Sequence, residues 1–285
     1  MTRWLVTGCN GMLGRDLLAV LENRDVIACT RSDLNVTDAE AAQQTIDEAR
    51  PDVVANCAAW TAVDDAEEHE DAAFAVNAVG AANLARACAK HSAALVHIST
   101  DYVFDGLAES PYAEDSPLSP RCAYGRTKAA GEWAVQAILA ERSWIVRTAW
   151  LYGAGGPNFV RTMIRLESTM DTIDVVDDQR GQPTWSAQLA HQVVRLVDTA
   201  APAGVYHGTA AGQTTWYGLA RAVFEGLGAD PDRIRPTTTD RVPRPAPRPA
   251  YSVLGHDAWS RAGLPAPSDW RASLAQAFES LRKAA

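Results

Sequence analysis

A tyrosine and a lysine four positions apart are the residues of this sequence best suited to acid–base chemistry. They stand in "YGRTK" as Tyr124 and Lys128. On a helix, positions i and i+4 share one face, so the phenol and the ammonium can converge on one substrate. A nearby cation favours the phenolate, which predicts a lowered pKa for Tyr124 and proton transfer near neutral pH. The chain has three lysines and seven tyrosines, so chance would place such a pair only about 0.07 times per chain.

A hydroxyl at the end of a predicted strand is a third candidate for the same chemistry. The stretch "HISTDYVFDG", residues 97–106, begins as a buried strand and ends in polar residues. Thr100 would stand at the carboxyl end of that strand, where its hydroxyl can donate to a carbonyl oxygen that becomes an alkoxide. On its own, a Ser-Thr-Asp at a strand end is more often a turn or a helix cap. Together with Tyr124 and Lys128, it becomes a plausible catalytic residue.

A glycine-rich loop follows the first predicted strand. In "VTGCNGMLG", Gly8, Gly11 and Gly14 have the spacing G-x-x-G-x-x-G at a strand-to-helix junction. Such glycines allow a tight turn and close approach of the backbone to a pyrophosphate, and the helix N-terminus offers free N–H groups to the anion. We therefore predict a dinucleotide site whose loop contacts include Gly8, Asn10, Gly11, Met12 and Leu13.

The end of the second predicted strand bears on the choice of cofactor. An acidic residue is expected there in NAD-binding proteins, but the sequence "CTRSDLN" has Arg31 at this place. A guanidinium can pair bidentately with a 2′-phosphate, so we predict NADPH, with NADH as the alternative. In that alternative Arg31 is solvated and Asp33 holds the ribose.

The elements that must position these residues alternate between strand-like and helix-like runs up to about residue 150. This alternation predicts an α/β fold, a doubly wound parallel sheet of the Rossmann type, whose ligands lie at the carboxyl ends of the strands. We expect residues 1–150 to form the dinucleotide-binding domain and 151–285 mainly a smaller, interleaved substrate domain. Segments near 170–200 are expected to return to the first domain.

The sequence also predicts the local structure of three further segments. The four prolines of "RVPRPAPRPA", residues 241–250, exclude a central strand or a helix, and predict an ordered extended loop or a mobile flap. The acidic run "DDAEEHED", residues 64–71, is most simply a solvated first helical turn. Ser268 is expected to cap a C-terminal helix.

Composition excludes several classes of function. The chain has 285 residues and a formal net charge of −9, which disfavours binding to nucleic acid. The sequence shows neither a signal peptide nor a run of about 18 apolar residues, so we expect a cytoplasmic protein without a membrane span. The five cysteines include no CxxC pair, and we expect neither a disulfide framework nor a metal site.

The combined motifs resemble the extended short-chain dehydrogenase/reductase family, and within it the reductases of dTDP-linked keto-sugars. The resemblance covers nearly the whole chain and runs through "TGCNGMLG", "RPDVVANCAAWTAVDDAE", "HISTDYVFDG", "YGRTKAAGE", "RTAWLYGAGGPNFVRTM", "DDQRGQPT" and "GVYHGTAAGQTTW". No single motif is as specific as this combination.

The resemblance implies roles for individual residues. It places the family's catalytic Ser/Thr, Tyr and Lys set on Thr100, Tyr124 and Lys128. It also implies a set of residues on the adenosine and pyrophosphate side, namely Asn35, Val36, Cys57, Ala58 and Ala59. Contacts to the sugar nucleotide are implied for Val63, Tyr102, Trp150 and, at the diphosphate, Arg248. Without the resemblance, Trp150 would be read as a core residue.

The reaction implied is the NADPH-dependent reduction of the C4 keto group of dTDP-4-dehydro-L-rhamnose to dTDP-L-rhamnose. Related dehydratases carry Asp-Glu after the threonine, whereas this chain has Asp101 followed by Tyr102, which favours simple reduction. Some family members use a glutamate after the glycine loop in a magnesium-linked dimer. Arg15 stands there in this chain, so we expect no magnesium and a monomer, with a weak dimer as the alternative.

Two other functions remain open from sequence. The chain could reduce another dTDP-4-keto-deoxysugar, such as one that leads to dihydrostreptose or to an antibiotic sugar. It could also be a non-catalytic nucleotide-binding regulatory subunit, although the intact set of Thr100, Tyr124 and Lys128 counts against this.

Overall fold

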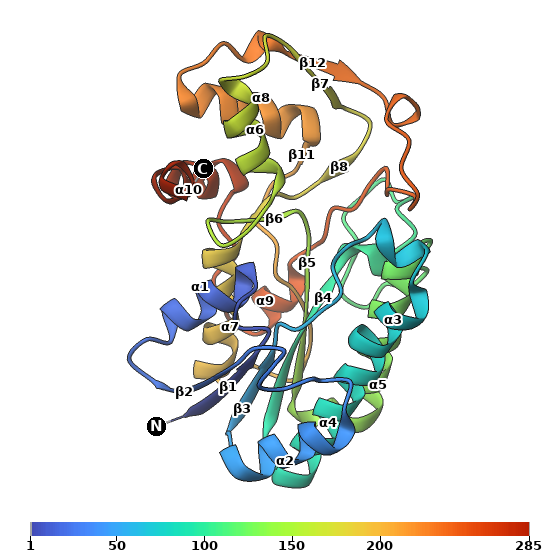
Figure 1. Cartoon of the computed structure of the whole chain (residues 1–285), viewed down its shortest axis with the longest axis vertical. Coiled ribbons are helices and arrows are strands. Elements are labelled where there is room, and N and C mark those ends of the chain that lie inside the picture. Colours follow the sequence, from blue (N-terminus) through green and yellow to red (C-terminus); the bar gives the residue numbers. More distant parts are fainter. Residues whose placement is uncertain (1, 285) are drawn as a thin grey trace.

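Six parallel strands form the central sheet in the part of the chain described by the computed structural model, residues 2–284. The sheet order is β10-β5-β4-β3-β1-β2 (Figure 1). The strands are β1 (Arg3–Thr7), β2 (Asp25–Cys29), β3 (Val53–Asn56), β4 (Ala94–Thr100), β5 (Ser143–Thr148) and β10 (Gly204–His207). The order reverses between β1 and β3, so the ligand site of a doubly wound sheet is expected beside their carboxyl ends. The predicted fold class is confirmed.

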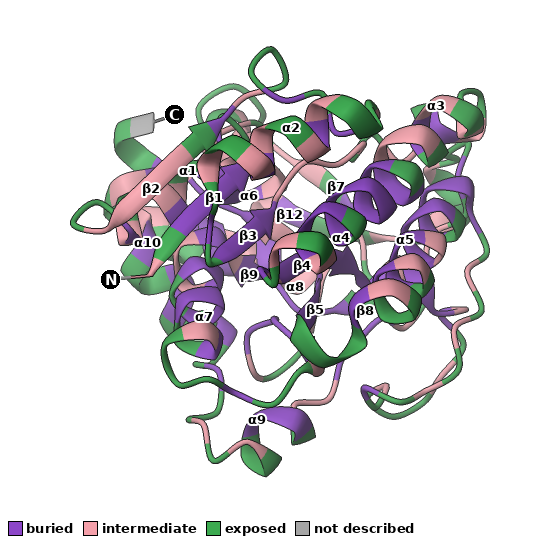
Figure 2. Cartoon of the chain, turned by 90° about the horizontal axis from the view of Figure 1, so that it is seen from below, coloured by how far each residue is buried: buried purple, intermediate pink, exposed green. Residues whose placement is uncertain are grey.

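Helices cover both faces of this sheet. They are α1 (Met12–Val20), α2 (Ala39–Ala49), α4 (Gly80–His91), α5 (Ala123–Leu139) and α7 (Ser186–Asp198). Successive strand residues point to opposite faces: Val53 and Ala55 belong to the core under α1 and α7, and Val54 to the core under α2, α4 and α5. Buried strands and helices dominate the centre of the molecule in Figure 2. Because both faces are covered, the strands consist mainly of apolar residues.

Residues 70–91 form one nearly continuous helical stretch made of α3 (Glu70–Phe74), a π-helical turn (Ala75–Val79) and α4. Among the described residues it is the one helix that is long and apolar enough to cross a membrane by length and composition, which the sequence analysis did not expect. In the fold, α4 contacts α2, α5, β3 and β4. These contacts are those of a core helix.

The chain beyond β5 builds a second group of elements above the sheet (Figure 1). The short helix α9 (Asp257–Arg261) packs with α7 and β10 in the core of the central sheet, and the helices of the second group are α6 (Phe159–Glu167), α8 (Trp216–Leu227) and α10 (Trp270–Ala284). Its strands are β6 (Leu151–Tyr152), β7 (Ile173–Val176), β8 (Arg180–Gly181), β9 (Thr184–Trp185), β11 (Thr214–Thr215) and β12 (Ile234–Thr237). In the described chain they pair as β6 with β9, β7 with β12 and β8 with β11. By contrast, α7 and β10 lie with the central sheet, so the two groups are interleaved in sequence.

The acidic run 64–71 is only partly the expected solvated turn, because some of its carboxylates are exposed while others contact distant segments. The Asp64 carboxylate accepts from the Arg248 guanidinium at 2.8 Å, which fastens the proline-rich segment 241–250. Glu67 accepts from the backbone N–H of Ala123 at 2.8 Å, at the start of α5. These carboxylates therefore help to hold two segments of the candidate site.

The C-terminal helix is capped one residue later than predicted. Asp269, not Ser268, precedes α10, and its carboxylate accepts from the backbone N–H of Arg271 at 2.8 Å. A carboxylate at this position satisfies a free N–H of the first turn.

Candidate active site

A cavity of about 460 Å³ opens at the carboxyl ends of the central strands. It is lined by the glycine loop, by the ends of β3, β4 and β5 and by the first turns of α5. Thr100, Tyr124 and Lys128 all lie in its wall. The three predicted catalytic residues, which are up to 28 positions apart, are thus brought to one cavity.

The first turn of α5 is fixed against the end of β4. Its N-cap is Cys122, whose sulfur accepts from the backbone N–H of Gly125 at 3.3 Å. Gly125 is packed so closely that a Cβ there would lie 2.2 Å from the carbonyl oxygen of Tyr102. This close approach places Tyr124 beside Thr100, and both side chains line the cavity.

The Lys128 ammonium is buried, and it donates to the carbonyl oxygen of Ile98 at 2.6 Å. Burial lowers the pKa of Lys128 to about 8, although the Glu132 carboxylate opposes this shift. The lysine therefore remains mostly charged at neutral pH and loses its charge at mildly alkaline pH.

Burial raises the pKa of the Tyr124 phenol, and the neighbouring Asp101 carboxylate raises it further. This is the opposite of the lowering expected from Lys128, whose ammonium is directed to the Ile98 carbonyl. Desolvation of the phenolate is the larger effect at this position. A phenol that stays protonated has the form that a proton donor needs.

The position of Thr100 fits both interpretations from the sequence, a helix cap and a catalytic hydroxyl. Its hydroxyl oxygen accepts from the backbone N–H of Tyr102 at 3.2 Å, as a cap would. The hydroxyl also donates to Asp101 Oδ1 at 2.9 Å. Asp101 lines the cavity and is buried, which raises its pKa to about 6. The sequence analysis did not include Asp101 in the site.

A second cavity, of about 240 Å³, continues from the glycine loop toward β2. Its wall contains Gly8, Gly11, Arg31, Asn35, Val36, Cys57, Ala58 and Ala59. Asn10 lies at an adjoining opening with Arg31, and Met12 and Leu13 face the larger cavity. All predicted cofactor residues therefore border these connected openings.

The loop itself has the features of a pyrophosphate cradle. Gly8 has φ +61°, and a Cβ there would lie 2.7 Å from the backbone nitrogen of Ala58. A Cβ at Gly14 would lie 2.4 Å from the carbonyl oxygen of Gly8, so the helix packs directly on the turn. No side chain caps the N-terminus of α1 at Gly11. The residues present fit a dinucleotide, because the backbone can approach a pyrophosphate closely and the uncapped N-terminus of α1 offers N–H groups to an anion.

Arg31 and Asp33 differ in what they contact. The Asp33 carboxylate accepts from the Thr30 hydroxyl at 2.6 Å and from the Thr30 backbone N–H at 2.8 Å. Arg31 is exposed at the mouth of both cofactor openings. Because Thr30 engages Asp33, the guanidinium is the group at this edge that is better placed for an incoming phosphate.

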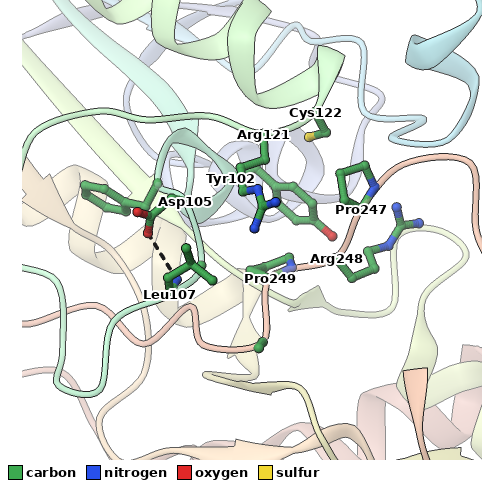
Figure 3. Close-up of a pocket in the computed structure, with 11 residues that line it drawn as sticks. Tyr102, Asp105, Leu107, Arg121, Cys122, Pro247, Arg248 and Pro249 are labelled. Atoms are coloured by element: carbon green, nitrogen blue, oxygen red, sulfur yellow. Dashed lines mark hydrogen bonds between the residues drawn. The ribbon is translucent and has the colours of Figure 1, made fainter. Parts of the chain in front are cut away.

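The predicted sugar contacts divide between two pockets. Val63, Tyr102 and Trp150 line the larger cavity. Arg248 lines an adjoining pocket of about 100 Å³ together with Tyr102 and Arg121 (Figure 3). Tyr102 borders both, so the pockets are neighbours across its side chain. The sequence analysis did not include Arg121 in the site. Arg121 precedes α5, and nothing in the local sequence indicates that it lies near Arg248 in the fold.

Comparison with known proteins supports a common ancestry over the whole chain. Residues 2–283 match the family model described as RmlD substrate binding domain. A Streptomyces niveus protein named dTDP-4-keto-6-deoxy-D-glucose reductase is 55% identical, over 97% of this chain and 96% of its own length. A Streptomyces griseus protein named dTDP-4-dehydrorhamnose reductase is 54% identical, over 98% and 94% respectively.

Solved structures give the same result. The crystal structure of a dTDP-4-dehydrorhamnose reductase from Bacillus anthracis in complex with NADP is 37% identical, with a TM-score of 0.93 over 98% of this chain and 99% of that one. A dTDP-4-dehydrorhamnose reductase from Clostridium acetobutylicum is 42% identical, with the same TM-score and the same coverage. The predicted resemblance is confirmed, and the chain belongs to the RmlD substrate-binding domain family of the extended short-chain dehydrogenase/reductases.

Proposed function

We propose that this protein reduces the C4 keto group of a dTDP-linked 4-keto-6-deoxysugar with NADPH. Its substrate is dTDP-4-dehydro-L-rhamnose and its product dTDP-L-rhamnose. The observation that carries the proposal is the convergence of Thr100, Tyr124 and Lys128 on one cavity beside the glycine loop. Relatives at 46–54% identity that are named for this activity support the choice of substrate.

The cofactor would lie along the connected openings of the glycine loop. The first N–H groups of α1 and the close approach at Gly8 would hold its pyrophosphate. Arg31 would pair with the 2′-phosphate, and Lys128 would hold the ribose next to the nicotinamide. Bound NADPH supplies the hydride, and the protein supplies orientation and charge.

The proton comes from the protein. Tyr124, kept protonated by its buried surroundings, donates its proton to the sugar oxygen as that oxygen becomes an alkoxide. The Thr100 hydroxyl, beside it, would turn from Asp101 to donate its hydrogen bond to the same oxygen.

The sugar nucleotide would span both pockets. Val63, Tyr102 and Trp150 surround the sugar in the larger cavity. Arg248 and Arg121 line the adjoining pocket (Figure 3), where two guanidinium groups would suit a doubly charged anion, with that of Arg248 also paired with the Asp64 carboxylate. In this arrangement, residues 1–150 with α7 and β10 would form the cofactor-binding domain and also supply four of these sugar-nucleotide contacts, and residues 151–285 would supply Arg248.

The same chemistry on a different dTDP-4-keto-6-deoxysugar is the second candidate. It is favoured by the relative at 55% identity, which is named for a 4-keto-6-deoxy-D-glucose derivative. The two candidates share cofactor, catalytic residues and mechanism, and differ in which face of the sugar lies toward the nicotinamide. For the protein as a whole, we propose a cytoplasmic monomer.

The proposal is tested by following NADPH absorbance with purified protein and each dTDP-4-keto-6-deoxysugar. Oxidation that depends on the keto-sugar supports it, and the sugar with the highest kcat/KM identifies the substrate. If no such sugar causes NADPH oxidation while the protein binds NADPH, the chain is a nucleotide-binding regulatory protein instead.

A further inference from the structure

Trp150, the aromatic residue of the sugar cavity, has an unusual backbone conformation. It lies between β5 and β6 and has φ +46°, in the left-handed region that a bulky side chain rarely adopts. Such a conformation persists only where the surrounding structure holds the residue in place. The contacts of its ring show what holds it.

One face of the Trp150 indole is covered by a second indole. Trp216, the first residue of α8, stacks on it with ring centroids 3.7 Å apart and planes inclined by 10°. The ring of Phe159 packs on Trp216 in turn, with centroids 4.7 Å apart. This stack fixes the tilt of the Trp150 ring.

The other face lies against a backbone segment that has no side chain. A Cβ at Gly181 would be 2.5 Å from Trp150 Cε2 and 2.7 and 2.8 Å from the bonded atoms Cζ2 and Nε1. Distances in this order place the Cβ above the ring and not at its edge. Because Trp216 occupies one face, Gly181 lies over the opposite one. The two residues form a slot for the ring, which we call the Trp150 slot.

The walls of the slot are joined to each other. β8, which ends at Gly181, pairs with β11, which ends one residue before Trp216 (Figure 1). The Trp216 indole N–H donates to Gln179 Oε1 at 3.1 Å, and the Gln179 amide donates to the Thr239 hydroxyl at 3.0 Å. The spacing of the walls is therefore set by a paired strand and a hydrogen-bond chain.

We propose that Gly181 and Trp216 are positioning residues that hold Trp150 as a rigid aromatic wall for the sugar ring of the substrate. Because Trp216 covers one face and Gly181 covers the Cε2 end of the other, the sugar would contact the remaining part of the indole, which lines the cavity and whose orientation is already fixed. This inference rests on the proposed function, because it assigns the sugar to the cavity that Trp150 lines. Neither wall residue lines that cavity or the cofactor opening, so both act through Trp150.

The test uses the full chain with separate variants of each wall. Trp216→Leu removes the stacked ring, and Gly181→Ala places a methyl group where the Trp150 ring now lies. For either change we expect the KM of the dTDP-4-keto-6-deoxysugar to rise about tenfold with the KM of NADPH within about twofold, as for lost binding of one substrate. Trp216→Phe keeps an aromatic face and should recover most of the affinity. Trp133→Leu, a loss of an exposed tryptophan on α5, is the matched control.

The outcomes separate the two proposals. An absence of turnover by the wild-type protein with every dTDP-4-keto-6-deoxysugar overturns the proposed function. Wild-type turnover with unchanged sugar KM in both folded variants overturns only the positioning role. A parallel rise in the KM of NADPH also overturns it, because that result indicates a general structural effect. Circular dichroism identifies a variant that has not folded. In that case, the KM values of the variant of the other wall residue test the positioning role.

Discussion

The Lys128 ammonium lies 2.6 Å from the backbone carbonyl oxygen of Ile98, at the end of the strand that carries Thr100. The same buried lysine that faces the cofactor cavity is therefore anchored to β4 and not to the Tyr124 phenol. Its charge depends on pH within the range in which enzymes are assayed.

Activity should decline above about pH 8. Burial lowers the pKa of Lys128 to about 8, so the ammonium is present below that pH and is lost above it. The kcat/KM for NADPH should then fall about tenfold per pH unit in the alkaline limb. Measurement between pH 6 and 9.5 checks this, and a flat profile to pH 9.5 would be inconsistent with the role of Lys128.

Unfolding should not explain this decline. The unfolded chain binds more protons at Lys128 than the folded one between about pH 8 and the ordinary lysine pKa of 10.5. Stability contributed by this residue therefore increases as pH rises through that window. Thermal unfolding at each assay pH provides the control, and Lys128→Met should remove the alkaline limb while reducing the rate.

Replacement of Tyr124 by phenylalanine should reduce kcat by about two to four orders of magnitude, the usual contribution of a general acid. NADPH affinity should stay nearly the same, because the ring and its packing are kept. Steady-state rates together with a fluorescence titration of NADPH test both parts. Turnover similar to that of the wild type would assign the proton to another group.

Arg31→Ala should weaken NADPH binding by about tenfold or more, the effect of losing a charge-assisted bidentate pair. NADH binding should change little, since NADH has no 2′-phosphate. Dissociation constants of both cofactors are the measurement, with the exposed Arg235→Ala as a control of equal charge. Equal weakening of NADPH and NADH would place Arg31 elsewhere than at the 2′-phosphate.

The buried ion pair under the site should be important for stability. Glu132 and Arg147 pair at 2.8 Å with side chains 0% and 3% exposed. Removing one partner leaves an uncompensated buried charge, so Glu132→Ala should lower the free energy of unfolding by about 3–5 kcal/mol. The exposed pair of Glu70 and Arg126, 43% and 45% exposed, is the control, and Glu70→Ala should cost at most about 1 kcal/mol. Urea denaturation that gives similar losses for both would contradict this difference.

The sequence predicts those parts of the site that depend on local patterns. The glycine loop and the Tyr-x-x-x-Lys pair are each set by short-range spacing, and the alternation of elements predicts the sheet that brings them to Thr100. Contacts between distant segments were not predictable. The Asp64–Arg248 pair and the Trp150 slot join residues far apart in the chain, and no local periodicity marks them. The pKa of Tyr124 was predicted in the wrong direction, because spacing indicates a nearby cation but not the degree of burial.

The most direct test of the reductase function follows one hydrogen atom. The protein is incubated with dTDP-4-dehydro-L-rhamnose and NADPH that carries deuterium at both C4 positions of the nicotinamide, and the product is examined by NMR. The account predicts dTDP-L-rhamnose with a single deuterium at C4 of the sugar. Recovery of unchanged keto-sugar, or of product without deuterium at C4, would contradict it.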